Sequence, residues 1–150
     1  MIAQDVECAA MKAELFLPED YRPAEDENFM NDRQLEYFRR KLLVWKQELL
    51  DQSAETIDNL QESARSVPDL ADRASEETDR ALELRTRDRQ RKLVSKIDAA
   101  LRRIENGEFG YCEVTGEPIS LKRLDARPIA TMTLEAQEKH ERREKVHRDD

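Results

Sequence analysis

The sequence predicts a mainly α-helical protein, in which a long antiparallel two-helix coiled coil projects from a small globular knob and a C-terminal helix follows. Three observations favour this fold class. Charged residues make up 40% of the 150 residues and hydrophobic residues only 38%, a composition typical of long solvated helices with a thin core. Two long stretches of helix formers carry apolar residues at heptad spacing. A short break containing Pro68 separates them, and such a break is typical of a hairpin turn.

The N-terminal segment, residues 1–32, is predicted to be mostly irregular. A single helical turn is expected over residues 11–16, and Pro18 and Pro23 stop it. Residues 24–28 are acidic and typical of a loop. We therefore expect this segment either to be disordered or to pack on or near the knob.

The coiled-coil hairpin is predicted to span residues 33–106, with its tip at 67–74. Its first arm begins after Asn31 and Asp32, which offer a helix N-cap. Its apolar residues are predicted to form one seam made of two neighbouring rows with heptad spacing. The first row is Leu43, Leu50, Ile57 and Ala64, and the second is Leu35, Leu42 and Leu49, with Phe38, Trp45 and Leu60 nearby. An arm of this length would reach roughly 50 Å at 1.5 Å per residue.

The second arm is predicted from about Asp69 to Glu105, and Asn106 and Gly107 read as its C-cap. Its apolar seam is clearest in the half far from the tip. The expected seam residues are Leu93, Val94, Ile97, Leu101 and Ile104, with Ala81 and Leu84 nearer the tip. Two arms of similar length joined by a short break should pack antiparallel.

The predicted knob, residues 107–133, gathers all three glycines of the chain around Cys112. A zinc knuckle needs a second cysteine three residues on and two more later, but the third position after Cys112 is Thr115. His140 and His147 lack partners at ligand spacing. We therefore expect a degenerate, zinc-finger-like knob held by packing and hydrogen bonds, without a metal. Residues 134–150 are predicted to form a polar C-terminal helix.

Two carboxylates, Asp69 and Asp72, lie at the predicted tip beside Pro68. Asp69 can cap the second arm, and Asp72 can occupy its first turn, where negative charge favours the helix dipole. Alternatively, both carboxylates are exposed to meet a metal or a basic partner, although two acids alone make a weak Mg²⁺ site. The two interpretations are compatible.

A basic run follows in the middle of the second arm. It is either a solvated face with salt bridges to the acid-rich first arm or a surface that docks on an acidic protein rim or on phosphates. The run comprises Arg85, Arg87, Arg89, Arg91 and Lys92.

The charge and the motifs exclude several functional classes. A net charge of −8 makes general attraction to nucleic acid or anionic lipid unfavourable. No apolar run reaches the roughly 18 residues of a membrane span, and the N-terminus lacks a signal-peptide pattern. Cys8 and Cys112 lie far apart, so we expect a reducing cytoplasm. No phosphate-binding loop or nucleophile motif indicates an enzyme, and a self-contained hairpin predicts a monomer.

Several motifs together resemble one known family. Residues 69–74 read Asp-Leu-Ala-Asp-Arg-Ala and fit a DxxDxA tip motif. Residues 83–93 are similar to the second-arm signature, and residues 109–112 and 123–128 fit the knob. Over about residues 30–145, in the same order, the chain resembles the DksA/TraR family of bacterial RNA polymerase regulators.

The resemblance implies a regulator that binds RNA polymerase and inserts its coiled-coil tip into the secondary channel. It also implies altered open-complex stability, with repression at ribosomal RNA promoters in the stringent response, together with the alarmone ppGpp and without direct reading of DNA sequence. The implied positions are the effector residues Asp69, Asp72 and Ala74, the polymerase-docking residues Arg85 and Arg89, and the ppGpp-facing residues Leu93, Lys96 and Arg127.

The chain departs from the family's usual pattern in the knob. By alignment, the four zinc positions are Cys112, Thr115, Thr133 and Ala136, so the chain resembles a cysteine-poor branch that does without zinc. The position after Ala136, where the family pattern has a lysine, is Gln137 here. Two alternatives remain open: a Gre-like factor that assists transcript cleavage, and a structural coiled-coil adaptor.

Overall fold

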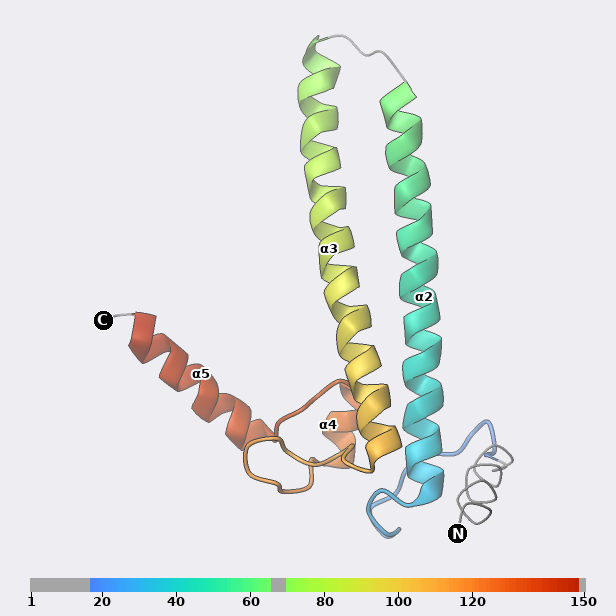
Figure 1. Ribbon diagram of the computed structural model, residues 1–150, viewed down its shortest axis with the longest axis vertical. Helices are drawn as coiled ribbons and strands as arrows, with labels where there is room; N and C mark the ends of the chain where they lie inside the picture. The colour runs from blue at the N-terminus through green and yellow to red at the C-terminus, as the bar shows by residue number, and fades with distance from the viewer. Residues whose placement is uncertain (1–16, 66–69, 149–150) are drawn as a thin grey trace, which may run out of the picture. The chain divides into compact units, whose positions relative to one another are not determined.

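The computed structural model describes the backbone of residues 17–65 and 70–148, and the side chains of 17–62 and 72–148 (Figure 1). The helices are α2 (Asp32–Arg65), α3 (Leu70–Asn106), α4 (Leu121–Ala126) and α5 (Leu134–Arg148). Between the helices, Tyr111 and Pro118 form an isolated bridge. The predicted mainly α class, with two long helices and a C-terminal helix, is confirmed. The expected turn over 11–16 and the tip residues 66–69 lie outside the described residues.

The chain divides into two compact units. The base unit comprises residues 1–42 and 100–150, and the arm unit comprises residues 43–99. Both long helices contribute to both units. None of the helices described is long and apolar enough to cross a membrane.

Local hydrogen bonds define two helix ends where the sequence predicts them. The Asn31 side-chain oxygen accepts from the Gln34 backbone N–H at 2.8 Å, which makes Asn31 the N-cap of α2. At the end of α3, Gly107 has φ +75°. The Glu108 N–H donates to the Arg103 carbonyl at 2.9 Å, as in a Schellman motif. Both predicted caps are confirmed.

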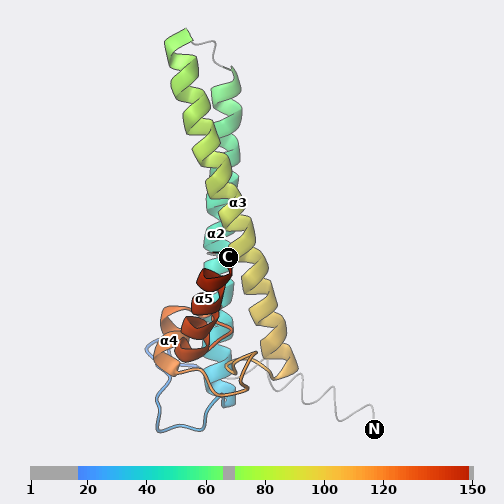
Figure 2. The same ribbon diagram turned by 90° about the vertical axis from the view of Figure 1, so that its left-hand side faces the viewer.

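Contacts within the arm unit show that α2 and α3 run antiparallel. Lys46 Nζ lies 2.7 Å from Asp98 Oδ1, and farther along α2 the Ser53 hydroxyl donates to Gln90 Oε1 at 3.1 Å. Partner numbers on α3 fall as numbers on α2 rise, so the chain directions are opposite. The two helices lie side by side in both views (Figure 1 and Figure 2). The predicted antiparallel pairing is confirmed.

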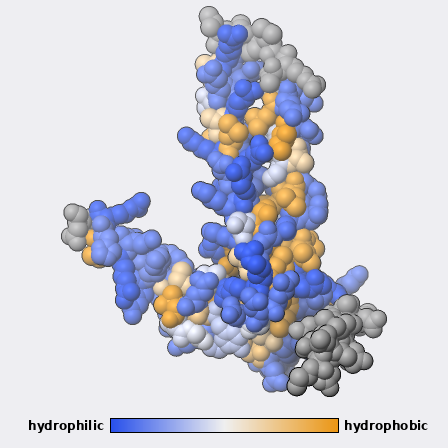
Figure 3. All heavy atoms as spheres, in the orientation of Figure 1, coloured by the Kyte–Doolittle hydropathy of each residue, from blue (hydrophilic) through white to orange (hydrophobic). Residues whose placement is uncertain are grey.

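The seam on α2 is narrower than the one that the sequence predicts. Leu42 and Leu49 are buried, with 0% and 6% of their surface exposed, whereas Leu43 and Leu50 are 40% and 44% exposed. Adjacent residues on a helix are about 100° apart, so only one of the two rows can face α3. The prediction that both rows belong to one seam is therefore wrong for Leu43 and Leu50. Apolar side chains remain visible along the arms on the face shown in Figure 3.

The seam on α3 is apolar only in its base-proximal part. Ile97 is fully buried, as predicted. Ala81 and Leu84 are exposed, so the prediction that they extend the seam toward the tip is wrong. The half-buried positions there are Glu76, Glu83, Thr86 and Arg87, all polar or charged, which an apolar pattern cannot reveal.

The core of the base unit forms around two phenylalanines. Phe38 and Phe109 are 0% and 1% exposed, and their ring centroids lie 5.5 Å apart. Helix α4 adds Leu124, which is fully buried. Its N-cap is Ser120, whose hydroxyl oxygen accepts from the Arg123 N–H at 3.3 Å. This six-residue helix was not predicted, because glycine and proline nearby dominate the local pattern.

The described part of the N-terminal segment contacts both α2 and the loops after α3. Gln34 is fully buried, and its amide donates to the Ala24 carbonyl at 3.2 Å. Phe29 meets Tyr111 edge-on, with centroids 5.4 Å apart. A Cβ at Gly110 would lie 3.0 Å from the Met30 side chain. Gly110 also has φ +90°, a backbone conformation that glycine adopts without strain.

Asp125 joins α4 to α2 through two side chains. Its Oδ1 accepts from the Tyr37 hydroxyl at 2.7 Å and from Lys41 Nζ at 2.6 Å, and Lys41 also donates to the Asp125 carbonyl. The hydrogen bond from Lys41 outweighs partial burial and lowers the pKa of the Asp125 carboxyl. This cluster fixes the end of α4 against the start of α2.

Asp125→Ala should lower the free energy of unfolding by about 1–3 kcal/mol, because the partly buried Tyr37 hydroxyl loses its acceptor and Lys41 loses its carboxylate partner, keeping only the backbone carbonyl. Urea denaturation measures the change. The matched control is Asp88→Ala, since Asp88 is exposed and pairs only loosely with Arg91 at 3.9 Å; its expected effect is below about 0.5 kcal/mol. Equal losses of stability in both variants would contradict the claim that Asp125 fixes α4 against α2.

Candidate functional site

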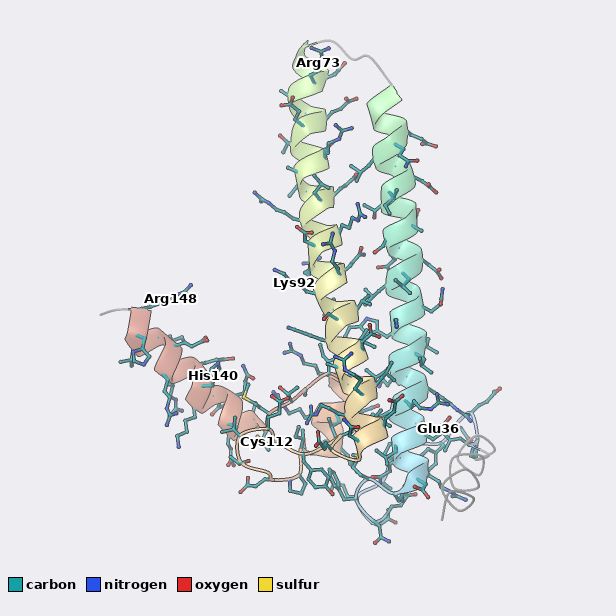
Figure 4. The ribbon with its side chains drawn as sticks, in the orientation of Figure 1. Glu36, Arg73, Lys92, Cys112, His140 and Arg148 are labelled. Carbon is teal, nitrogen blue, oxygen red and sulfur yellow. The ribbon has the colours of Figure 1, made fainter. Side chains whose placement is uncertain are left out.

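The tip-side end of α3 carries the predicted effector residues. Because α3 begins at Leu70, Asp72 lies in its first turn, where the helix dipole favours a carboxylate. Ala74 follows, and both side chains are exposed. Figure 4 labels Arg73 at this end of the helix. Asp69, the other predicted tip carboxylate, lies outside the described residues.

A shallow hollow follows α3 away from this end. Its volume is about 370 Å³, and Leu82 in it is 54% exposed. The lining residues are Ala74, Glu77, Thr78, Ala81, Leu82 and Arg85. It therefore connects a predicted effector residue, Ala74, with a predicted docking residue, Arg85. This surface was not predicted, although the spacing of its residues along one face of the helix can be read from the sequence.

The basic run is largely solvated. Arg85, Arg89 and Lys92 are exposed on α3 (Lys92 is labelled in Figure 4). Arg91 pairs with Asp88 of its own helix at 3.9 Å. An exposed pair at this distance contributes little to stability, so these side chains stay adaptable for contacts with a partner.

The predicted ppGpp-facing residues fall in different units. Leu93 is half-buried and Lys96 exposed on α3 in the arm unit. Arg127 is exposed in the base unit, where it forms the C-cap of α4 and its N–H donates to the Arg123 carbonyl at 2.8 Å. Gln137, in α5, donates from its side chain to Glu141 at 2.9 Å.

Hydrogen bonds join three of the four positions aligned with zinc ligands at one buried thiol. Cys112 is 4% exposed, and its sulfur receives hydrogen bonds from Thr115 and from the Thr133 backbone. Thr133 also caps α5, because its hydroxyl oxygen accepts from the Ala136 N–H at 3.3 Å. Ala136 is buried as well. The loop around Cys112 and the start of α5 are thus joined by hydrogen bonds to the Cys112 sulfur, and the Thr133 hydroxyl caps the helix.

Two family profiles match successive parts of the chain. The profile described as "DnaK suppressor protein DksA, N-terminal domain" matches residues 34–104, and "Prokaryotic dksA/traR C4-type zinc finger" matches residues 107–142. A curated protein of Caulobacter vibrioides (strain NA1000 / CB15N), named RNA polymerase-binding transcription factor DksA, is 72% identical over 131 residues, covering 87% of this chain and 92% of that protein. The chain belongs to the DksA family.

Other members of the DksA family extend the likeness. The Escherichia coli (strain K12) protein of the same name is 42% identical over 127 residues, covering 85% of this chain and 84% of that protein. The solved structure of transcription factor DksA2 from Pseudomonas aeruginosa superposes with a TM-score of 0.74 at 37% identity, covering 91% of this chain and 97% of that one. The predicted family resemblance is confirmed, and the fold agrees with a known member.

The C4 zinc finger that the DksA family profile describes does not fit the residues present here. Zinc sites of that class use four thiolates, whereas the four positions hold Cys112, Thr115, Thr133 and Ala136. One thiol, two neutral hydroxyls and a methyl group cannot replace that set. Within the described residues, no three histidine, cysteine or acidic side chains gather as a metal site. His140, labelled in Figure 4, instead lies 3.3 Å from Glu144 on its own helix.

The surroundings of Cys112 favour its thiolate. Burial opposes ionisation, but hydrogen bonds from Thr115, Thr133 and Val114 outweigh it and lower the pKa of the thiol to about 7. An unfolded cysteine has a pKa of about 8.5. Because the pKa of the thiol is lower in the folded chain, the unfolded chain binds more protons at pH values between the two pKa values. The contribution of this thiol to stability is therefore complete above about pH 8.5 and lost as the pH falls through about 7.

Cys112→Ser should remove this pH dependence. From pH 6 to pH 9, the wild-type protein should gain stability relative to the variant by on the order of 1 kcal/mol, since one pKa unit corresponds to about 1.4 kcal/mol. Denaturation curves of both proteins across this range measure the difference. Parallel pH profiles for the two would contradict the thiolate assignment.

Proposed function

We propose that this protein is a non-enzymatic transcription regulator that binds bacterial RNA polymerase through its secondary channel and changes the lifetime of promoter open complexes. The observation that carries the proposal is its 72% identity over 87% of the chain to a protein named RNA polymerase-binding transcription factor DksA. Repression at ribosomal RNA promoters in the stringent response, with ppGpp as co-regulator, is part of the same proposal.

The hairpin supplies the reach that this mechanism needs. Helix α3 has 37 residues and is therefore roughly 55 Å long. A factor of this kind changes the behaviour of the polymerase only by binding one of its states better than another. A preference of a few kcal/mol at the tip changes a complex lifetime by orders of magnitude, because about 1.4 kcal/mol corresponds to a factor of ten.

Each group of side chains takes a distinct role in this proposal. Asp72 and Ala74, with Asp69, act on the polymerase at the tip, and the hollow that ends at Arg85 makes the adjoining contact, with Arg89 beside it. Leu93, Lys96 and Arg127 face the alarmone at the polymerase interface. A lysine point charge and a forked arginine are suitable partners for its phosphates.

The regulator is proposed to work as a monomer in the cytoplasm, without a zinc ion and without reading DNA sequence. Metal analysis of the purified protein should find far less than one zinc per chain, and a chelator should leave its melting temperature unchanged. The physical reason is the lack of a thiolate set at the four knob positions. Equimolar zinc, together with destabilisation by the chelator, would contradict this expectation.

A direct test is competition for the secondary channel. Purified polymerase should bind the protein, and a Gre factor that enters the same channel should displace it. A cleavage assay on backtracked complexes examines the second candidate, a Gre-like factor, which the acidic tip residue Asp72 favours. Cleavage stimulated by the protein would support that candidate. Binding that a Gre factor does not displace would contradict the channel proposal and favour a structural adaptor.

A further inference from the structure

The seam of the arm unit changes its chemistry partway along. On α3, positions spaced by seven residues are Ile97, Gln90, Glu83 and Glu76 toward the tip. Ile97 is fully buried and Gln90 is 8% exposed, whereas Glu83 and Glu76 are only half-buried. The same heptad row that packs apolar side chains near the base thus carries carboxylates nearer the tip.

A polar layer marks the point of change. The Gln90 side chain accepts from the Ser53 hydroxyl at 3.1 Å and donates to Gln52 Oε1 at 3.1 Å. Both ends of a buried amide are therefore satisfied by α2. Such a layer fixes the register of two helices but contributes less stability than an apolar layer would.

Beyond this layer the two helices have little shared core. We call residues 54–62 of α2 and 72–89 of α3 the distal segment; within these ranges no side chain is buried. The α2 row shows the same change, from Leu49, 6% exposed, to half-buried Thr56. Since burial of apolar surface supplies most of the stability of a helix pair, the distal segment is held together weakly.

Three threonines weaken the helices of the distal segment further. The hydroxyls of Thr56, Thr78 and Thr86 each donate to the carbonyl four residues earlier, at 2.9, 3.1 and 3.0 Å. Bonds of this kind slightly destabilise and bend helices. Sparse packing and these hydrogen bonds therefore both lower the stability of the distal segment.

We propose that the distal segment opens as a cooperative unit of its own, bounded by the layer of Gln52, Ser53 and Gln90, and that contact with RNA polymerase closes it. The claim that polymerase closes the segment rests on the proposed function. Segments with few buried apolar contacts open at a lower free energy than the rest of a fold. A partner that binds the closed form shifts the equilibrium toward it, so insertion and closing of the arm are coupled.

Hydrogen exchange of the full-length free protein tests the opening. Backbone amides of residues 75–86 should exchange at least about tenfold faster than those of residues 93–98. Glu83→Leu extends the apolar row and should slow the distal amides by about tenfold or more, while the proximal amides change little. The matched control is Glu55→Leu, which makes the same substitution at an exposed position of the same segment and should leave the exchange rates unchanged.

Equal exchange rates in the two parts, or equal effects of the two variants, would overturn the proposed opening. A second experiment adds saturating RNA polymerase, which should slow the distal amides by more than about tenfold. If polymerase binds and the distal rates stay the same, the coupling is wrong. If polymerase does not bind, the proposed function fails, and the comparison in the free protein still decides whether the segment opens independently.

Discussion

Replacing Phe38 by alanine is expected to lower the free energy of unfolding by about 3–5 kcal/mol, because a buried ring is lost and a cavity remains. Phe38 is fully buried and packs against Phe109, 1% exposed, and Tyr37, whose ring centroids lie 5.5 and 5.2 Å away. Phe38 and Phe109 are the two largest fully buried side chains of the base unit, so removing one ring leaves a large gap in its core. Chemical denaturation followed by circular dichroism measures the loss.

The control for Phe38→Ala is Val44→Ala, a truncation on the same helix. Val44 is 60% exposed, and its replacement should cost less than about 0.5 kcal/mol. A loss below about 1 kcal/mol for Phe38→Ala, or similar losses for both variants, would show that the base unit is not organised around this aromatic pair.

Asp72→Asn is expected to remove most of the effect on open complexes while the protein still binds polymerase. The substitution keeps the size of the side chain and removes one charge at the start of α3. If the carboxylate acts on a polymerase state at the tip, its loss should reduce the change in open-complex lifetime by about tenfold or more, equivalent to about 1.4 kcal/mol. Filter binding against a competitor measures the lifetime, and a polymerase-binding assay runs in parallel.

Asp79→Asn is the matched control for this experiment. Asp79 is also exposed on α3, seven residues farther from the tip, and its replacement removes the same charge. The control should act like the wild-type protein. Full activity of Asp72→Asn would show that this carboxylate is not needed. An equal loss in both variants would show that general charge matters and not this carboxylate in particular.

Helix ends were predictable because their signals are local. Asn31 caps α2 with its own side chain, and Gly107 ends α3 with a positive φ that glycine adopts without strain. The choice between neighbouring heptad rows was less predictable. Leu42 and Leu43 have the same chemistry, and only the position of the partner helix decides that Leu42 is buried and Leu43 is 40% exposed.

In the candidate site too, features that depend on residue type alone were predictable, and features that depend on the folded chain were not. A cysteine without its three partners could be read from the sequence, because the donor set that it leaves is visible in the residue types alone. The lowered pKa of Cys112 could not, because the backbone N–H groups of Val114 and Thr133 reach the sulfur only in the folded chain. The polar layer at Gln90 was likewise hidden, since its partner Ser53 lies on the other arm.

The most direct test of the central claim is the lifetime of open complexes at a ribosomal RNA promoter, measured with purified polymerase, with and without this protein and ppGpp. We predict that saturating protein shortens the lifetime by about tenfold or more, and that ppGpp shortens it further, as differential binding to polymerase states requires. An unchanged lifetime while the polymerase is saturated with the protein would contradict the account.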